Sequence, residues 1–359
     1  MMRMVRKLAL GVAGLALAAG VGVKLFQPRL GELALARIAG ERVGRDVTAG
    51  LPDGLHVIIC GSGSPLPDPT RTGPCTIVIA GTHIYQVDAG EGGTRKLNQI
   101  GLPIGRIEGL FLTHFHSDHI DGLGPLMLLR WSGRSNTGPL PIHGPPGVET
   151  VVAGFNAAYA QDNGYRTAHH GPAIMPPSGA GGRAMPFAIG AAPVVVSDAD
   201  GVRITAFPVN HAPVQPAVGY RFDYKGRSVV ISGDTAPSPS LVRAAKGTDL
   251  LVHEALQPRL VRILTATLAK AGQANTAQIT RDILDYHSTP EQAADAAKAA
   301  GARALVLNHI VPPLPLGFAY PAFLGDAATH FSGPITIGED GMMLDLPAGS
   351  TAITTRKLL

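Results

Sequence analysis

A cluster of histidines and aspartates directly after an apolar segment constrains this chain more than any other feature. Residues 112–122 read LTHFHSDHIDG. At an extended strand end His114 and His116 project to the same side, and Asp118 and His119 follow where the strand turns toward a helix. Neutral imidazole and carboxylate are ligands that zinc accepts. The spacing therefore predicts a metal site at the end of a strand.

The rest of the chain has the composition of a folded enzyme. Apolar residues make up 45% of its 359 residues, and 45 glycines and 30 prolines mark turns. Strands are predicted at 55–60, 75–80, 83–88, 107–113, 139–143, 193–197, 202–208, 217–224, 227–232, 249–253, 303–308 and 334–346. Helices are predicted at 91–100, 122–131, 147–161, 238–247, 276–287 and 289–301, the last with a capping box at Thr289 and Gln292. The pattern indicates one domain over 51–359, with two sheets covered by helices.

The N-terminus is predicted to direct the chain to or across a membrane. Residues 1–24 contain four basic residues, no acidic one and an apolar stretch from 8 to 23. A cleaved signal peptide and a retained anchor both have this pattern, and the alternatives stay open. Residues 25–50 are then an amphipathic linking helix. The expected location is exported, either periplasmic or anchored in the inner membrane facing the periplasm.

Charge and cysteine content exclude several classes of protein. The chain has 30 basic and 26 acidic residues, and the four basic residues of the first 24 account for the difference. The remainder has no net charge, which is not typical of a nucleic-acid-binding surface. The two cysteines, Cys60 and Cys75, exclude a cysteine-rich metal site. They form either one disulfide or two buried thiols.

Several motifs in sequence order resemble the metallo-β-lactamase superfamily, in particular its ribonuclease Z and arylsulfatase-like branch. The signature His-x-His-x-Asp-His is preceded by CGSGSPLPDPTRTGPC and YQVDAGEGGTRKL, and followed by VNHAPVQPAVGYRF, ISGDTAPS, LLVHEAL, DYHSTPEQAA and LVLNHIVP. The resemblance covers nearly the whole chain after Leu55. It implies an α/β fold, a four-layer αββα sandwich.

The resemblance also implies two metal ions per chain, expected to be zinc, with manganese or iron as alternatives. The first metal would be held by His114, His116 and His211. The second would be held by Asp118, His119 and His309, and Asp234 would bridge the two metals. The later ligands follow the apolar segments ITAFPVNH, SVVISGD and ALVLNH, so we expect them to meet at one sheet edge. Two bridged cations supply hydroxide near neutral pH, which predicts a hydrolase.

The resemblance implies that three residues act in catalysis. His287 of the HST segment would stabilise transition-state charge or protonate the leaving group, and Asp118 would combine ligation with catalysis. Glu254 would orient His287 or, alternatively, hold a metal-ligating imidazole. His253 is expected to be structural.

Four residues of YRTAHHG precede PAIMPPSGAGGRAMP, which is predicted to be a flexible loop. They are candidates for lining the substrate entrance, with plain surface positions as the alternative: Tyr165, Arg166, His169 and His170.

The expected substrate is a small phosphate or sulfate ester. Ribonuclease Z enzymes that cut tRNA precursors carry a protruding arm between the third ligand motif and the bridging aspartate, where residues 212–233 have room only for two strands and a turn. With no net charge after residue 24, this predicts a phosphodiesterase or sulfatase without a nucleic-acid partner. The alternatives are a lactone or β-lactam hydrolase, tRNA 3′ processing, and a non-catalytic metal-binding scaffold. Further expected partners are a membrane contacted through the N-terminus and a second copy in a homodimer.

Overall fold

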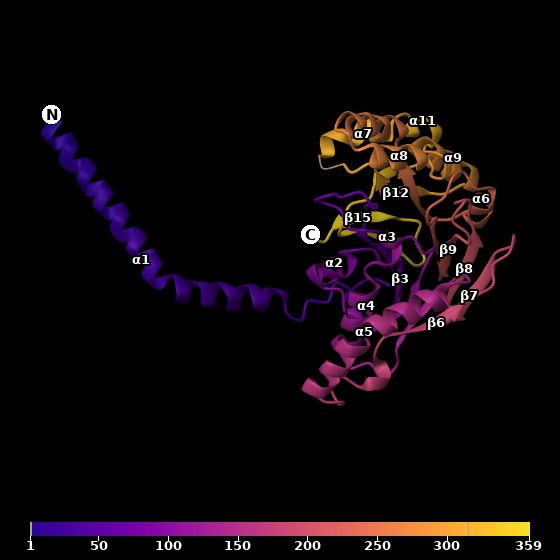
Figure 1. Ribbon diagram of the computed structural model, residues 1–359, viewed down its shortest axis with the longest axis horizontal. Helices are drawn as coiled ribbons and strands as arrows, with labels where there is room; N and C mark the ends of the chain where they lie inside the picture. Colours follow the sequence, from indigo (N-terminus) through magenta and orange to yellow (C-terminus); the bar gives the residue numbers. More distant parts are fainter. Residues whose placement is uncertain (1, 315) are drawn as a thin grey trace. The chain divides into compact units, whose positions relative to one another are not determined.

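The structure is a computed structural model that describes residues 2–314 and 316–359. It divides into two compact units, residues 1–47 and 48–359. The first unit is a single helix, α1 (Met2–Arg42), which runs through the predicted junction between residues 24 and 25 (Figure 1). Within the described residues, no helix combines the length and the apolar character that crossing a membrane requires.

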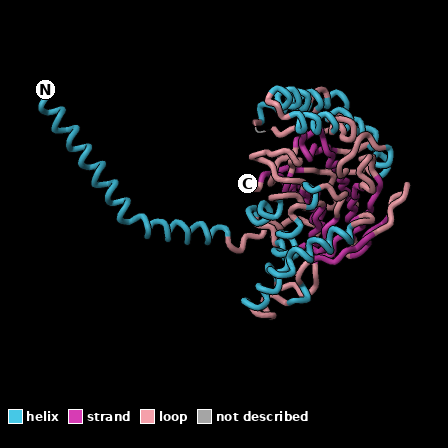
Figure 2. The backbone as a smooth tube through the Cα atoms, viewed as in Figure 1, coloured by secondary structure: helices cyan, strands magenta, loops and turns pink. Residues whose placement is uncertain are grey.

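Two mixed β-sheets form the centre of the second unit, with helices around them (Figure 2). In the described part of the chain the first sheet has eight strands, in the order β15 (Thr354–Lys357), β14 (Met342–Pro347), β1 (Gly54–Gly61), β2 (Cys75–Ala80), β3 (His83–Val87), β4 (Ile107–Phe111), β5 (Leu140–Gly144) and β6 (Gly182–Pro186). The second has seven, in the order β13 (Ile335–Ile337), β12 (Ala304–Val311), β11 (Leu250–Leu256), β10 (Arg227–Ile231), β9 (Val218–Tyr224), β8 (Val202–Pro208) and β7 (Val194–Ala199).

The main core lies between the two sheets. Val57 and Val78 of the first sheet pack in one cluster with Ile204, Phe222 and Val252 of the second. All of β1, β2 and β11 is buried, which explains why their sequences are nearly continuous apolar runs rather than alternating ones. Burying each such Val or Ile side chain stabilises the fold by about 1.5–3 kcal/mol.

Helices cover the outer face of each sheet, which completes the predicted four-layer αββα sandwich. The first sheet is contacted by α2 (Gly93–Ile100), α4 (Leu123–Arg134) and α5 (Val148–His170). The second is covered by α6 (Pro239–Ala244), α9 (Pro290–Ala300), α10 (Tyr320–Leu324) and α11 (Ala327–His330), whose buried residues pack against β10, β11 and β12. The capping box at Thr289 and Gln292 opens α9 as predicted.

Three further helices lie in the connections around the strand ends. The short α3 (Ser117–Ile120) follows β4, while α7 (Pro258–Lys270) and α8 (Ala274–Asp282) follow β11 and pack against each other. Cys60 of β1 and Cys75 of β2 form a disulfide, so the two cysteines are bonded and are not free thiols.

Some elements differ from those predicted, and tertiary pairing explains most of the differences. The segment 334–346 forms two strands, β13 and β14, in different sheets. β6 lies in the predicted flexible loop, where its Gly- and Pro-containing sequence is held extended by parallel pairing with β5. β15 has four exposed residues and pairs antiparallel with β14. The sequence pattern also missed α7 and the extension of α5 to His170.

Candidate metal centre

The predicted ligands come from the carboxyl ends of strands in both sheets. His114 follows β4, Asp234 follows β10, and His309 lies near the end of β12. β10, β11 and β12 run parallel, as do β3, β4 and β5, so these strand ends gather at one edge of each sheet. His309 sits opposite a register shift between β11 and β12 and has a φ of 46°, an unusual backbone conformation for a histidine that re-aims its side chain.

Glycine allows the loop after β3 to approach the helix that carries Asp118. A Cβ atom on Gly90 would lie 2.5 Å from the carbonyl oxygen of Asp118 and 2.4 Å from the carbonyl carbon of Gly73. Only glycine permits three backbone segments to pack this closely. Gly90 therefore helps to position the helix that carries Asp118.

The first predicted ligand group is assembled in the structure. Ligand atoms of His114, His116, His211 and Asp234 all lie within 4.8 Å of one another. Nε2 of His114 is 3.0 Å from Nδ1 of His116 and 3.9 Å from Oδ2 of Asp234. Nε2 of His211 lies 4.0 Å from the same carboxylate oxygen.

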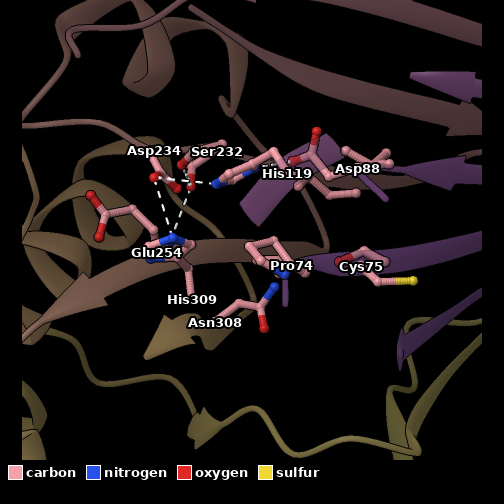
Figure 3. Close-up of a pocket in the computed structure, with 14 residues that line it drawn as sticks. Pro74, Cys75, Asp88, His119, Ser232, Asp234, Glu254, Asn308 and His309 are labelled. Atoms are coloured by element: carbon pink, nitrogen blue, oxygen red, sulfur yellow. Dashed lines mark hydrogen bonds and ion pairs between the residues drawn. The ribbon is translucent and has the colours of Figure 1, made fainter. Parts of the chain in front are cut away.

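The second predicted group is assembled beside it. Ligand atoms of Asp118, His119 and His309 lie within 4.8 Å of one another, and Nε2 of His309 is 3.2 Å from Oδ2 of Asp118. Oδ2 of Asp234 is 3.3 Å from Nε2 of both His119 and His309 (Figure 3). One carboxylate oxygen of Asp234 thus faces imidazoles of both groups.

The buried carboxylates create a strongly cation-attracting environment. Burial lowers the pKa of His114 well below its usual value. Burial also disfavours charge on His119, but Asp234 and Asp118 outweigh it and raise its pKa well above the usual value. Burial by itself would raise the pKa of Asp234, yet His309 and His119 hold it well below. A metal cation would compete with protons for the ring nitrogens of these histidines.

Orphaned polar atoms support metal binding at this point. Nε2 of His119, Nε2 of His211 and Oδ1 of Asp234 are buried and make no hydrogen bond within the described part of the chain. Such atoms are costly to bury without a partner. A nitrogen and oxygen donor set of this kind fits zinc, and three histidines with one carboxylate are enough for a tetrahedral site.

Asp88 and Thr113 support the ligands and were missed by the sequence interpretation. Nδ1 of His119 donates to Oδ2 of Asp88 at 2.8 Å, and Thr113 donates to the same carboxylate through its backbone nitrogen and its hydroxyl. The available signal was the aspartate that ends YQVD, the last residue of the strand predicted at 83–88. His211 is oriented similarly, because its Nδ1 donates to the carbonyl oxygen of Tyr286 at 3.0 Å.

Glu254 and His287 form a buried pair next to the cluster. Nδ1 of His287 lies 3.0 Å from Oε1 of Glu254, which also accepts hydrogen bonds from the backbone nitrogens of Thr235 and Ser288. A ring nitrogen of His287 lies within 4.8 Å of ligand atoms of Asp234 and His309. Glu254 therefore orients His287 and ties together the loops that carry Asp234 and His287.

Two connected clefts open beside the ligands. The apolar cleft, about 200 Å³, is bounded by Asp118, Asp234 and His287 on one side and by Leu66 and Tyr286 on the other. The acidic cleft, about 620 Å³, is bounded by charged residues: Asp68, Arg71, Glu91, Asp118 and Asp121. Asp118 lines both clefts, as do Ser64, Pro65 and Leu66, so the two clefts adjoin at these residues.

The predicted entrance residues lie elsewhere. Tyr165, Arg166, His169 and His170 are on the last turns of α5, along a shallow surface depression. Among the described residues that line the two clefts, none of the four occurs. His253 is buried, and its Nδ1 donates to the carbonyl oxygen of Glu254 at 2.7 Å, which agrees with the structural role expected for it.

Comparison with known proteins identifies the family. Residues 85–310 match the beta-lactamase superfamily domain. The ribonuclease Z of Mycobacterium avium (strain 104) is 39% identical over 288 residues, which are 80% of this chain and 96% of that protein. The chain belongs to the ribonuclease Z family of this superfamily. It is thus a metal-binding enzyme, a metal-dependent hydrolase.

Solved structures agree with the fold. The metallo-beta-lactamase fold protein YhfI from Bacillus subtilis has a TM-score of 0.57 and 22% identity, covering 81% of this chain and 99% of its own. The short form of human tRNase Z has a TM-score of 0.55 and 24% identity, again over 81% and 99%. The predicted four-layer sandwich is confirmed.

The substrate and partner predictions are wrong. A small phosphate or sulfate ester with no nucleic acid was expected, yet the chain matches proteins named ribonuclease Z over nearly their full length. Residues 212–233 do form only the end of one loop and the β9–β10 hairpin, but 39% identity to a ribonuclease Z over 80% of the chain outweighs this short interval. Net charge summed over a chain also says little about the field at a buried metal centre.

The predicted location is wrong as well. The likeness to ribonuclease Z proteins overturns the exported or inner-membrane-anchored assignment, and with it the membrane contact. The homodimer stays a prediction.

Proposed function

We propose that this protein is an endoribonuclease of the ribonuclease Z type that hydrolyses a phosphodiester bond at the 3′ side of tRNA precursors. The observation that carries the proposal is 39% identity across 96% of the length of a ribonuclease Z. The region matched to the superfamily domain, residues 85–310, includes all the predicted ligands.

Two zinc ions are proposed as cofactors. His114, His116 and His211 would hold one, and Asp118, His119 and His309 the other. The position of Asp234 supports a bridging role, since one of its oxygens lies 3.3–4.0 Å from imidazole nitrogens of both groups. When bound, the metals supply Lewis acidity toward the phosphodiester and a water that is nucleophilic near neutral pH.

The residues beside the metals are proposed to handle protons and orientation. His287 reaches into the apolar cleft and would donate a proton to the departing oxygen. Glu254 accepts from Nδ1 of His287 and holds the ring in that direction. Asp118, at the junction of the two clefts, combines ligation with contact to the substrate.

A comparison of two substrates tests this proposal. The zinc-loaded full chain is incubated with a precursor tRNA carrying a defined 3′ trailer and, separately, with bis(p-nitrophenyl) phosphate. We expect one discrete cleavage site in the precursor and a higher kcat/KM for it than for the small diester. His330→Ala, a surface change in a pair with Asp295, should behave like wild type. Rapid hydrolysis of the small diester with an intact precursor would contradict the proposal.

A further inference from the structure

An apolar wall faces the predicted ligands across the apolar cleft. The wall consists of uncharged side chains from three segments of the chain, namely the loop after β1, residues 279–286 and β12: Leu66, Ile279, Ile283, Tyr286 and Val311. The opposite side contains His116, Asp118, Asp234, His287 and His309. A substrate group that enters this cleft therefore meets the metal centre on one side and hydrocarbon on the other.

The wall is built into the fold. Leu66, Ile283 and Leu284 pack against a buried cluster of Leu256, Val261 and Val311. This cluster joins β11, α7 and β12 to the loop after β1. The wall is thus held on a packed support, as a preformed binding surface requires.

Tyr286 is the aromatic member of the wall and is fixed in place. Its carbonyl oxygen accepts from His211, and its ring centroid lies 4.9 Å from that of His211 at 80° and 4.7 Å from that of His287 at 44°. These are edge or tilted contacts. Within the described part of the chain no ring stacks parallel on Tyr286, and the residue is partly exposed.

The chemistry of the wall selects one part of an RNA substrate. A surface without charge or hydrogen-bond donors, apart from the tyrosine hydroxyl, gives a phosphate no partner. The planar face of a nucleobase is the apolar part of RNA, and bases stack on tyrosine rings whatever their sequence. A cleft of about 200 Å³ is below the usual size of a pocket for a drug-sized ligand, so it admits a single ring system.

Building on the proposed function, we propose that Tyr286 is a stacking platform for the nucleobase next to the scissile phosphodiester. The stacked base sets the register of the RNA strand over the metal centre. Tyr286 is then a substrate-binding residue that contributes to the choice of the cleaved bond.

Removing either the ring or the base tests the stacking. The substrates are a precursor tRNA whose cleavage site is mapped with wild type, and two versions with an abasic residue 5′ or 3′ of the cleaved bond. Tyr286→Ala should raise KM for the intact precursor about tenfold, the effect of losing one base–aromatic stack. One abasic version should show the same loss with wild type and no further loss with Tyr286→Ala. Tyr286→Phe should resemble wild type.

Matched variants separate stacking from support of the fold. Tyr286→Leu keeps an apolar side chain without an aromatic face, so it should show the same rise in KM as Tyr286→Ala. It replaces Tyr286→Ala in the test if that variant does not fold. Ile263→Ala removes a 65% exposed side chain from the same helical hairpin, outside the cleft, and should leave KM unchanged. Zinc content should equal that of wild type in all of these variants.

Fluorescence gives a readout that does not depend on turnover. The chain has one tryptophan, Trp131, whose ring is buried and donates to the carbonyl oxygen of Pro176. In Tyr286→Trp the second fluorophore should be quenched by the intact precursor, and less by the abasic version that abolishes stacking.

The possible outcomes are distinguishable. If wild type cleaves the precursor but Tyr286→Ala weakens intact and both abasic substrates equally, the stacking proposal is wrong and the proposed function stands. If zinc-loaded wild type cleaves no precursor, the proposed function fails, and the stacking proposal fails with it.

Discussion

Oδ2 of Asp88 lies 2.8 Å from Nδ1 of His119, and this contact fixes which nitrogen of the ring faces the metal centre. Asp88 itself has a φ of 56° and accepts two hydrogen bonds from Thr113. An aspartate held in the left-handed region by a network this dense stores backbone strain at the site. The carboxylate thus links the end of β3 to the ligands after β4.

Asp88→Asn should weaken zinc binding without unfolding the protein. Loss of a carboxylate that supports a ligating imidazole costs about 10- to 100-fold in metal affinity. Competition with a chromogenic chelator measures the change. Asp345→Asn is the matched control, because Asp345 contacts Nδ1 of His56 at 2.6 Å outside the cluster. Equal zinc affinity in Asp88→Asn and wild type would remove Asp88 from the metal centre.

Removing the metal should lower the stability of the fold. The buried imidazoles and carboxylates bind zinc only when the strand ends are assembled, so zinc binds the folded state preferentially. Free zinc at 100 times Kd should raise the free energy of unfolding by about 2.7 kcal/mol per site. Thermal unfolding of chelator-treated protein, with and without added zinc, measures this effect. An unchanged Tm would contradict a zinc centre made of these residues.

His287→Ala should leave both metals bound and slow the reaction. Loss of a positioned acid lowers the rate by about 10²- to 10⁴-fold. The loss should be larger on precursor tRNA than on bis(p-nitrophenyl) phosphate, because nitrophenolate departs without a proton. Rates and zinc content are measured on one preparation. If one zinc is lost, His287 is a ligand in the group that it forms with Asp234 and His309, and the assignment of His309 has to change.

The Cys60–Cys75 disulfide should stabilise the loop that borders both clefts. The bond links residues 15 apart in the sequence and encloses Ser64, Pro65 and Leu66. A disulfide that closes a loop of this length adds about 3 kcal/mol to the free energy of unfolding. Denaturant unfolding of wild type with and without reductant should show it, and a variant with both cysteines changed to alanine should not respond to reductant. Identical curves for wild type would argue against the bond.

The sequence was most informative where chemistry and periodicity coincide. Four ligand candidates within residues 112–122 had a spacing that brings their side chains to one point, and His211, Asp234 and His309 each ended an apolar segment. Asp234 follows β10 and His309 lies in β12. Both strands pair parallel with β11, and such pairing brings the strand ends together without further information. Boundaries of buried strands followed from their apolar runs for the same reason.

Elements and residues that depend on distant partners could not be predicted in this way. β6 is extended only because β5 lies beside it. Asp88 has no distinctive spacing, and its role emerges only when β3 and β4 are neighbours. Substrate class was misjudged because bulk charge and one short interval carry less information than identity over the whole domain.

The central claim is that Asp234 joins two zinc sites into one RNA-cleaving centre. The most direct test is the number of zinc ions bound per chain in Asp234→Asn. It is measured on the same sample that is used for precursor tRNA cleavage. Asparagine keeps the size of the side chain and removes the charge that faces both groups of imidazoles. The account predicts two zinc ions in wild type, at most one in the variant, and loss of precursor cleavage together with the metal. Two zinc ions and undiminished cleavage in Asp234→Asn would contradict it.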